Sequence, residues 1–294
     1  MTETFSWGTY AGPEGTRRYK LFVPSTVSSN KRRMIVMLHG CTQDPDDLAR
    51  GTRMNEIAGK EGFLVLYPEQ PVTANPLKCW NWFAAAHQGR DAGEPAILAA
   101  LIRQVIADQK VDRSKVYLAG ISAGGAMAAI MGATYPEMFS AVAMHSGIAY
   151  RVATDMSMAL AAMRGPPADT SMLGKAVVDA MGDRRKPMPS MILQGSKDPS
   201  VAPGNATLLA QQWRVANGIA DSIAPHRMDQ AGHYPVQQSS WRVKGKPVVE
   251  LWMIEGLAHA WSGGAKEGTY TDEKGPNASE AIVGFFVTQA RKRK

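Results

Sequence analysis

The sequence predicts an α/β fold in which a mostly parallel central sheet is covered by helices on both faces. Short apolar runs alternate with segments of helical periodicity, as in sheets built from strand-helix-strand units. One run passes through Gly-Ile-Ser-Ala-Gly into small helix formers, which predicts a strand, a sharp turn and a helix over residues 116–129. No repeat or linker divides the 294 residues, so we expect residues 1–294 to form a single domain.

The strands are expected where apolar residues, many of them β-branched or aromatic, follow one another in short runs. In chain order these runs are Arg18 to Val23, Met34 to His39, Phe63 to Tyr67, Val116 to Ala119, Ala141 to His145, Met191 to Gln194 and Val248 to Ile254. Between them, Glu94 to Asp108 carries one apolar stripe at helical spacing, with Pro95 in its first turn. A terminal helix is expected over roughly Asn277 to Ala290.

Residues 146–189 form an irregular, methionine-rich insertion between two predicted strands. Its methionines are Met156, Met158, Met163, Met172, Met181 and Met188, and Gly165-Pro166-Pro167 interrupts it. Methionine commonly fills gaps in a core. A long apolar insertion can also wall a binding pocket or act as a lid, so both interpretations stay open.

Composition and charge exclude several classes of protein. Hydrophobic residues make up 45% and charged residues 20% of the chain, which is ordinary for a globular domain. The net charge of +7 comes partly from clusters at residues 31–33 and 291–294, expected to be a solvated loop and tail. No nucleic-acid motif accompanies them, and no apolar run is long enough to span a bilayer, so neither partner is expected. Nothing indicates an oligomeric state.

Cys41 and Cys79 are the two cysteines of the chain. A bond between them would close a loop of about 39 residues and would stabilise the fold by about 4 kcal/mol in an oxidising compartment. Two reduced, buried thiols are the alternative. No signal peptide is visible in the first residues, which leaves the compartment open.

Ser122 has the sequence context of an enzymatic nucleophile. A strand before it and an Ala-rich helix after it would expose the hydroxyl at the apex of a turn, with Gly120 and Gly124 allowing close backbone contact. The N-terminus of that helix favours negative charge, and the Ala123 N–H can donate to an oxyanion. An ordinary strand-to-helix turn is the alternative.

A serine nucleophile needs a histidine base and an acid that orients it. In the order serine, acid, histidine, the acid and the histidine should each follow a later strand, as Asp198 and His259 do. The alternatives are weaker because they lie inside the insertion or before the last strand: Asp155, Asp169, Asp179, Asp183, His226 and His233. We therefore predict Ser122, Asp198 and His259 as the catalytic residues.

A second oxyanion donor is expected in the loop after an early strand. Gly40 allows a tight turn after Met34 to His39 and exposes the Cys41 N–H, which becomes the candidate beside Ala123. His39 is expected to orient this loop rather than to take part in the chemistry.

Several segments together are far more specific than the serine turn. They are His39-Gly40-Cys41-Thr42-Gln43, Cys79-Trp80-Asn81-Trp82-Phe83, the turn at residues 120–127, Gln194-Gly195-Ser196-Lys197-Asp198, and Ala258-His259-Ala260-Trp261-Ser262-Gly263-Gly264. In these segments the chain resembles the polyhydroxybutyrate depolymerase-type esterases of the α/β-hydrolase fold, from about Tyr19 to Phe286. The resemblance implies a serine hydrolase of carboxylic esters with the roles given above, a Cys41–Cys79 disulfide, and an extracellular or periplasmic enzyme.

The expected substrates are short-chain or hydroxyalkanoate esters, including polyesters such as polyhydroxybutyrate, with no metal or organic cofactor. Feruloyl or acetyl esters of plant polysaccharides are the close alternative, a serine peptidase is a more distant one, and a non-catalytic binding protein is the rival from another class. Aromatic residues near the motifs are candidates for the substrate pocket or for core packing: Trp80, Trp82, Phe83, Trp261, Tyr150 and, with them, the apolar Ile148. No polymer-binding module follows the terminal helix, so attack on crystalline polyester is expected to be weak.

Overall fold

The computed structural model describes residues 2–26, 32–165, 172–219, 226–229 and 233–290. Its main sheet is ten-stranded, in the order β1-β2-β4-β3-β5-β6-β7-β10-β9-β8. The neighbours from β4 through β10 pair in parallel, whereas β1, β2, β9 and β8 add antiparallel edges. The mostly parallel α/β sheet predicted from the sequence is thereby confirmed.

The strands of this sheet are β1 (Thr4–Gly12), β2 (Gly15–Val23), β3 (Arg32–Leu38), β4 (Phe63–Pro68), β5 (Val111–Ile121), β6 (Ala141–His145), β7 (Ser190–Gly195), β8 (His226–Met228), β9 (Val236–Val243) and β10 (Lys246–Ile254). Two short strands, β11 (Trp261–Ser262) and β12 (Thr271–Asp272), pair separately. Every predicted run lies in a strand, except that His39, the last residue of its run, follows the end of β3. The sequence missed β1, β8 and β9, because edge strands are half exposed and rich in polar residues.

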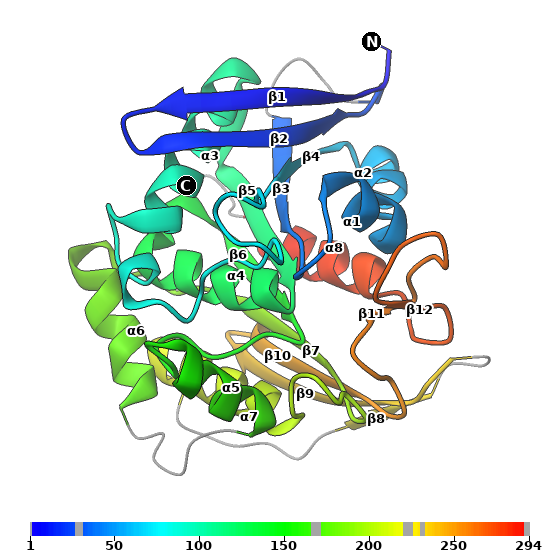
Figure 1. Ribbon diagram of the computed structural model, residues 1–294. Coiled ribbons are helices and arrows are strands. Elements are labelled where there is room, and N and C mark those ends of the chain that lie inside the picture. The colour runs from blue at the N-terminus through cyan, green and yellow to red at the C-terminus, as the bar shows by residue number, and fades with distance from the viewer. Residues whose placement is uncertain (1, 27–31, 166–171, 220–225, 230–232, 291–294) are drawn as a thin grey trace.

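Helices cover both faces of the sheet (Figure 1). One face carries α3 (Gly93–Asp108), α4 (Ala123–Thr134), α5 (Met156–Arg164), α6 (Leu173–Met181) and α7 (Gly204–Ala216), and the other carries α1 (Pro45–Thr52), α2 (Met54–Glu61) and α8 (Ala278–Thr288). Single 3₁₀ turns lie at Ala85–His87, Pro136–Met138 and Gly182–Arg184. None of the described helices combines the length and the apolar composition that a bilayer-spanning segment needs.

The methionine-rich insertion folds as α5 and α6 against the helical layer over one face of the sheet. Met181 and Met188 are buried in the main core, as gap-filling residues would be. Met156, Met158 and Met172 are exposed, whereas Met163 reaches a cavity beside Ser122. Gly165 precedes residues 166–171, which lie outside the described part of the chain. The insertion therefore packs as core and also contributes to a pocket wall.

The basic cluster at residues 31–33 differs from the expected solvated loop. Arg32 and Arg33 begin β3, and both are half-buried. The Arg33 guanidinium lies 4.0 Å from the centre of the Phe63 ring, so its charge is placed over an aromatic face rather than in a loop. Lys31 and the tail at residues 291–294 lie outside the described residues.

Candidate active site

Ser122 occupies a strained turn between β5 and α4. Its backbone has φ 56° and ψ −121°, a conformation that L residues rarely adopt, and its N–H donates to the His145 carbonyl at 2.9 Å. A Cβ on Gly124 would lie 2.1 Å from the Leu38 carbonyl oxygen, and one on Gly120 would lie 2.3 Å from the Gly124 oxygen. The two glycines are therefore needed for the backbone contacts that hold this turn.

A cavity of about 170 Å³ opens beside Ser122. Its walls are Gly40, Cys41, Gln43, Ile121, Ser122, Met163, Ser200, His259 and Tyr270. These residues come from segments far apart in the sequence: the loop after β3, the turn after β5, the insertion, and the loops after β7 and β10. The predicted nucleophile, the predicted base and one predicted oxyanion donor thus line one cavity.

Asp198 holds His259 by a direct hydrogen bond. His259 Nδ1 lies 2.7 Å from Asp198 Oδ2, although 61 residues separate the two in the chain. The other carboxylate oxygen, Oδ1, accepts the N–H groups of Ser200 and Val201, each at 2.8 Å. Burial raises the pKa of Asp198, but the His259 hydrogen bond and these backbone donors outweigh it, so the pKa falls below its ordinary value. The carboxylate is therefore kept ionised beside the imidazole.

The competing acids and histidines have other surroundings. Asp155 caps α5 by accepting the Met158 N–H at 2.8 Å, and Asp179 pairs with a lysine one helical turn away. His226 is exposed in the edge strand β8. Asp169 lies outside the described residues. None of the five that the structure describes, Asp183 and His233 included, lines the cavity beside Ser122.

The oxyanion donors predicted at Cys41 and Ala123 flank the nucleophile. The chain at Gly40 passes so close that a Cβ there would lie 3.4 Å from Ser122 Cβ. Ala123 is the first residue of α4, where N–H groups have no intrahelical acceptor. Among the described residues, neither the Cys41 nor the Ala123 N–H donates to a protein acceptor. Both groups are therefore available for a ligand oxygen.

His39 has the orienting contacts expected of it. It is fully buried, its Nε2 accepts the Gln70 N–H at 3.0 Å, and its Nδ1 donates to the Gly40 carbonyl at 2.7 Å. Burial lowers its pKa to about 4, so the ring is neutral around pH 7. It braces the loop that presents the Cys41 N–H.

The disulfide between Cys41 and Cys79 is present. It joins the loop after β3 to the segment that follows β4, across a sequence separation of 38. The bond confirms the pairing that the family resemblance implied and fixes one side of the cavity.

Comparison with known proteins assigns the family. The family model described as esterase PHB depolymerase matches residues 17–236. The chain belongs to this esterase family. Poly(3-hydroxyalkanoate) depolymerase C of Paucimonas lemoignei is 31% identical over 88% of this chain, and the alignment spans 61% of the depolymerase.

Two further relatives carry other activities in their names. Feruloyl esterase B of Neurospora crassa is 31% identical over 74% of this chain, and the alignment spans 75% of the relative's own length. A probable acetylxylan esterase A of Aspergillus clavatus is 30% identical over 71% of this chain and 69% of its own length. Among solved structures, an acetyl xylan esterase from Aspergillus awamori superposes with a TM-score of 0.77 at 20% identity. The superposition covers 96% of this chain and 99% of the acetyl xylan esterase. This likeness confirms the fold, and the relatives confirm a carboxylic ester hydrolase.

The aromatic residues predicted to bind substrate lie elsewhere. Trp80, Trp82, Trp261 and Tyr150 are buried in the cores, and Phe83 is a half-buried neighbour of Trp82. The polar atoms of Trp80, Trp261 and Tyr150 bind protein groups: Trp80 Nε1, for example, donates to the His39 carbonyl at 3.1 Å. None of the five lines the cavity beside Ser122. Core packing accounts for them, because the strands and loops that carry them direct these rings inward.

Among the described residues, Tyr270 is the tyrosine that lines the cavity, and no pattern in the sequence pointed to it. Its ring stands edge-on to His259 with centroids 6.1 Å apart, and its hydroxyl lies 3.3 Å from Thr42 Oγ1. It is 46% exposed and has a positive φ of 52°. Tyr270 therefore forms the rim between the histidine and the loop that carries the oxyanion donor.

Gln194 is a second residue that sequence reasoning did not single out for a role. It is fully buried at the end of β7, and its Nε2 donates to Asp198 Oδ2 at 2.9 Å and to the Val201 carbonyl at 3.0 Å. It thus binds the same carboxylate oxygen that contacts His259. No sequence pattern distinguishes a glutamine that makes this contact from any other glutamine at the end of a strand.

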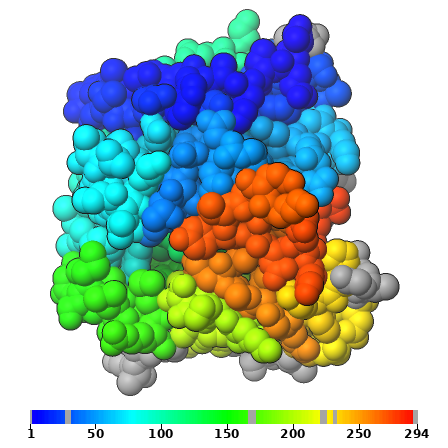
Figure 2. Space-filling model, turned by 45° about the vertical axis from the view of Figure 1, so that its right-hand side comes forward, coloured from blue at the N-terminus to red at the C-terminus, as the bar shows by residue number. Residues whose placement is uncertain are grey.

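The loop that carries Tyr270 is tied to the loop after β3. Gln43 accepts the Gly40 N–H at 2.9 Å through Oε1, and through Nε2 it donates to Asp47 and to the Thr269 carbonyl, both at 3.1 Å. The Thr269 N–H in turn donates to Asp47 Oδ1 at 2.9 Å. Figure 2 shows the segment around residues 256–277, in orange, against the blue surface of this region.

Proposed function

We propose that this esterase hydrolyses short acyl or hydroxyacyl esters through an acyl-Ser122 intermediate. The observation that carries the proposal is the meeting of Ser122 with an Asp198-bound His259 at one cavity that also has two unoccupied N–H donors. With Nδ1–H donated to Asp198, His259 presents Nε2 as the nitrogen that accepts the serine proton. This is the arrangement that a serine nucleophile requires.

In the proposed mechanism Ser122 Oγ attacks the ester carbonyl carbon and gives its proton to His259 Nε2. The tetrahedral oxyanion accepts hydrogen bonds from the Cys41 and Ala123 N–H groups, while Asp198 stabilises the imidazolium. The bond to the alcohol oxygen then breaks, and His259 returns the proton to the leaving alcohol. Water attacks the acyl group in the same way, giving its proton to His259, and releases the carboxylic acid and Ser122.

The size of the cavity favours small acyl groups. At about 170 Å³ it is smaller than the roughly 300–1,000 Å³ of typical ligand pockets, and Met163 and Tyr270 close two of its sides. An acetyl or hydroxybutyryl group suits this space better than a feruloyl ring. Relatives named as a polyhydroxyalkanoate depolymerase and as acetylxylan esterases both fit a small acyl group, so acetyl esters of polysaccharides are the second candidate.

The disulfide also supports a location. Disulfides persist in oxidising compartments and are rare in the cytosol. The Cys41–Cys79 bond therefore favours an extracellular or periplasmic enzyme that meets a polymeric or small ester there.

A substrate panel tests this function. We expect kcat/KM for nitrophenyl acetate and butyrate to exceed that for methyl ferulate by about tenfold or more, since a poorly fitting acyl group loses transition-state contacts. A 3-hydroxybutyrate dimer should be cleaved and a peptide substrate should not. Ser122→Ala, assayed in parallel, should be inactive on every ester. A preference for feruloyl esters, or turnover by Ser122→Ala, would contradict the proposal.

A further inference from the structure

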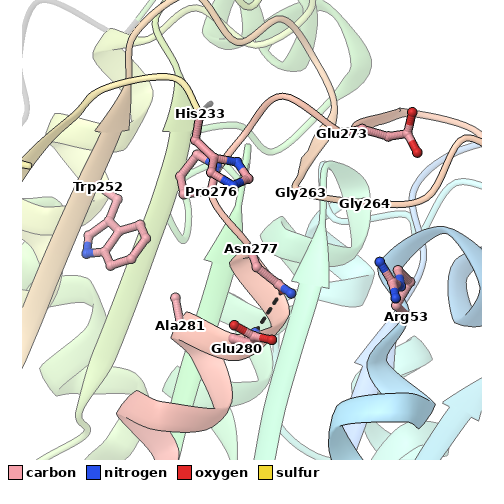
Figure 3. Close-up of a pocket in the computed structure, with 10 residues that line it drawn as sticks. All are labelled: Arg53, His233, Trp252, Gly263, Gly264, Glu273, Pro276, Asn277, Glu280 and Ala281. Atoms are coloured by element: carbon pink, nitrogen blue, oxygen red, sulfur yellow. Dashed lines mark hydrogen bonds between the residues drawn. The ribbon is translucent and has the colours of Figure 1, made fainter. Parts of the chain in front are cut away.

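A second and larger cavity lies next to the loop that carries His259. Its volume is about 630 Å³, within the range of ligand-binding sites. Trp252 stands on one side and Arg53 on the opposite side, with Asn277 and Glu280 at the start of α8 between them (Figure 3). It contains none of the proposed catalytic residues, so its chemistry is separate from that of Ser122.

The charged groups that line this cavity are more acidic than basic. The guanidinium of Arg53 faces a space that also holds the carboxylates of Glu273 and Glu280, and the ring of His233 lies nearby. Arg53 donates from Nε and Nη2 to the carboxylate of Glu56, which does not line this cavity. This pairing raises the pKa of Arg53, and the charge of Glu280 adds to the effect. Glu273 and Glu280 would repel an anionic ligand. An uncharged ligand with hydroxyl groups avoids this repulsion and can use both carboxylates as hydrogen-bond acceptors.

Hydroxyl groups match the donors and acceptors that remain. A carboxylate only accepts hydrogen bonds and a guanidinium only donates them, whereas a hydroxyl does both. A ligand with several neighbouring hydroxyls can therefore donate to Glu273 or Glu280 and accept from Arg53. The Asn277 Oδ1 is already engaged by the Glu280 N–H at 3.1 Å, which holds this side chain at the start of α8.

Trp252 supplies the apolar surface that such a ligand also needs. It is half-buried in β10, and its Nε1 donates to Glu250 Oε1 at 3.3 Å, which helps to hold the indole. Indole rings present a broad apolar face with a polar edge. The face beside Ala281 suits the C–H surface of a sugar ring.

We propose that this cavity binds a neutral oligosaccharide, the carbohydrate chain of an acetylated polysaccharide substrate. The inference deepens the proposed esterase function and rests on it. One loop connects the two sites, because His259 and Tyr270 line the catalytic cavity while Gly263, Gly264 and Glu273 line the second. A glycan held at Trp252 lies beside the loop that presents the catalytic base.

Binding of xylotetraose to the Ser122→Ala protein, measured by calorimetry and tryptophan fluorescence, tests the proposal without requiring turnover. We expect saturable binding that Trp252→Ala weakens about tenfold, the loss of roughly 1.4 kcal/mol of contact. Trp7→Ala removes an exposed indole from the edge strand β1, away from this cavity, and should leave binding unchanged. Glu280→Ala, on the exposed surface of α8, should weaken binding with no effect on folding.

Activity assays separate the two proposals. Trp252→Ala and Glu280→Ala in the active enzyme should keep their kcat/KM for nitrophenyl acetate and show a raised KM for acetylated xylotetraose. Absence of xylotetraose binding, or binding that neither substitution changes, would overturn the carbohydrate site. If the unsubstituted enzyme does not hydrolyse nitrophenyl acetate, the proposed function itself would be overturned.

Discussion

The two sides of the catalytic cavity are held together by different forces. On the strand-end side, formed by residues 38–41 and 116–129, backbone segments touch through glycines, and Ser122 is fixed by the resulting strain. On the loop side, formed by residues 194–201 and 255–277, side-chain hydrogen bonds hold Asp198 and His259 in place. The proposed nucleophile thus depends on steric fit, whereas the proposed base depends on a polar network.

This difference teaches where each side is vulnerable. A backbone contact at van der Waals distance has no room to relax, so one added methyl group should be felt at once. A hydrogen-bond network can lose one member and keep its fold, while the geometry of the charged pair drifts. Substitutions on the strand-end side should therefore affect stability first, and those on the loop side should affect the rate.

The strongest test of the strand-end side is Gly124→Ala. Its new Cβ would lie 2.1 Å from a backbone oxygen, which cannot move aside, so we expect a loss of more than about 4 kcal/mol of unfolding free energy, or no folded protein. Gly284→Ala in α8 is the matched control, because nothing lies within 4 Å of its Cβ and helix propensity favours alanine. Urea unfolding followed by circular dichroism compares the two. Equal stability would refute the steric account.

Removing the disulfide should have the next largest effect. The double substitution Cys41→Ser with Cys79→Ser frees a loop spanning 38 positions, which predicts a loss of about 4 kcal/mol in the chain-entropy model. Unfolding curves of the wild type with and without a reducing agent should differ by the same amount. Coincident curves would show that the bond does not restrain the unfolded chain.

On the loop side, Gln194→Met keeps the side-chain volume and removes the donor to Asp198. We expect kcat to fall roughly 10- to 100-fold with KM little changed, as a hydrogen bond to a charged group is worth about 1.5–3 kcal/mol. Without this competing donor, the Asp198 carboxylate would stabilise the imidazolium more strongly. The acid limb of the kcat/KM profile should therefore move to higher pH.

Gln212→Met is the control for Gln194. Gln212 is equally buried and donates to the Tyr150 and Leu173 carbonyls, with no contact to the catalytic residues. It should lower the unfolding free energy without changing the pH profile. A profile that stays in place for Gln194→Met as well would reduce Gln194 to a packing residue.

The smallest effect is expected at the rim. Tyr270→Ala opens the cavity beside His259 and should raise KM for short esters about fivefold, the loss of roughly 1 kcal/mol of substrate contact. Tyr270→Phe keeps the ring and loses the contact with Thr42, so it should stay near the wild-type value. Steady-state kinetics with nitrophenyl butyrate separates the two, and a larger effect for phenylalanine would assign the role to the hydroxyl.

The sequence was sufficient for the strand-end side and for the positions of Asp198 and His259. Glycine spacing, apolar runs and chain order report directly on backbone contacts and on strand ends, so the sequence predicts that Ser122, Asp198 and His259 follow strands β5, β7 and β10, as they do. Tyr270 and Gln194 were not, because their roles arise from contacts between segments with no shared pattern. For the tryptophans the sequence left pocket wall and core packing open, because an aromatic residue beside a motif packs inward as readily as it faces a substrate; the structure buries them.

Labelling with a fluorophosphonate probe, followed by peptide mass spectrometry, tests the central claim most directly. We predict a single adduct on Ser122 Oγ, absent from Ser122→Ala and slowed by several orders of magnitude in His259→Ala, with the double substitution no worse than either alone because the residues act as a unit. An adduct on another residue, or undiminished labelling without His259, would contradict the account.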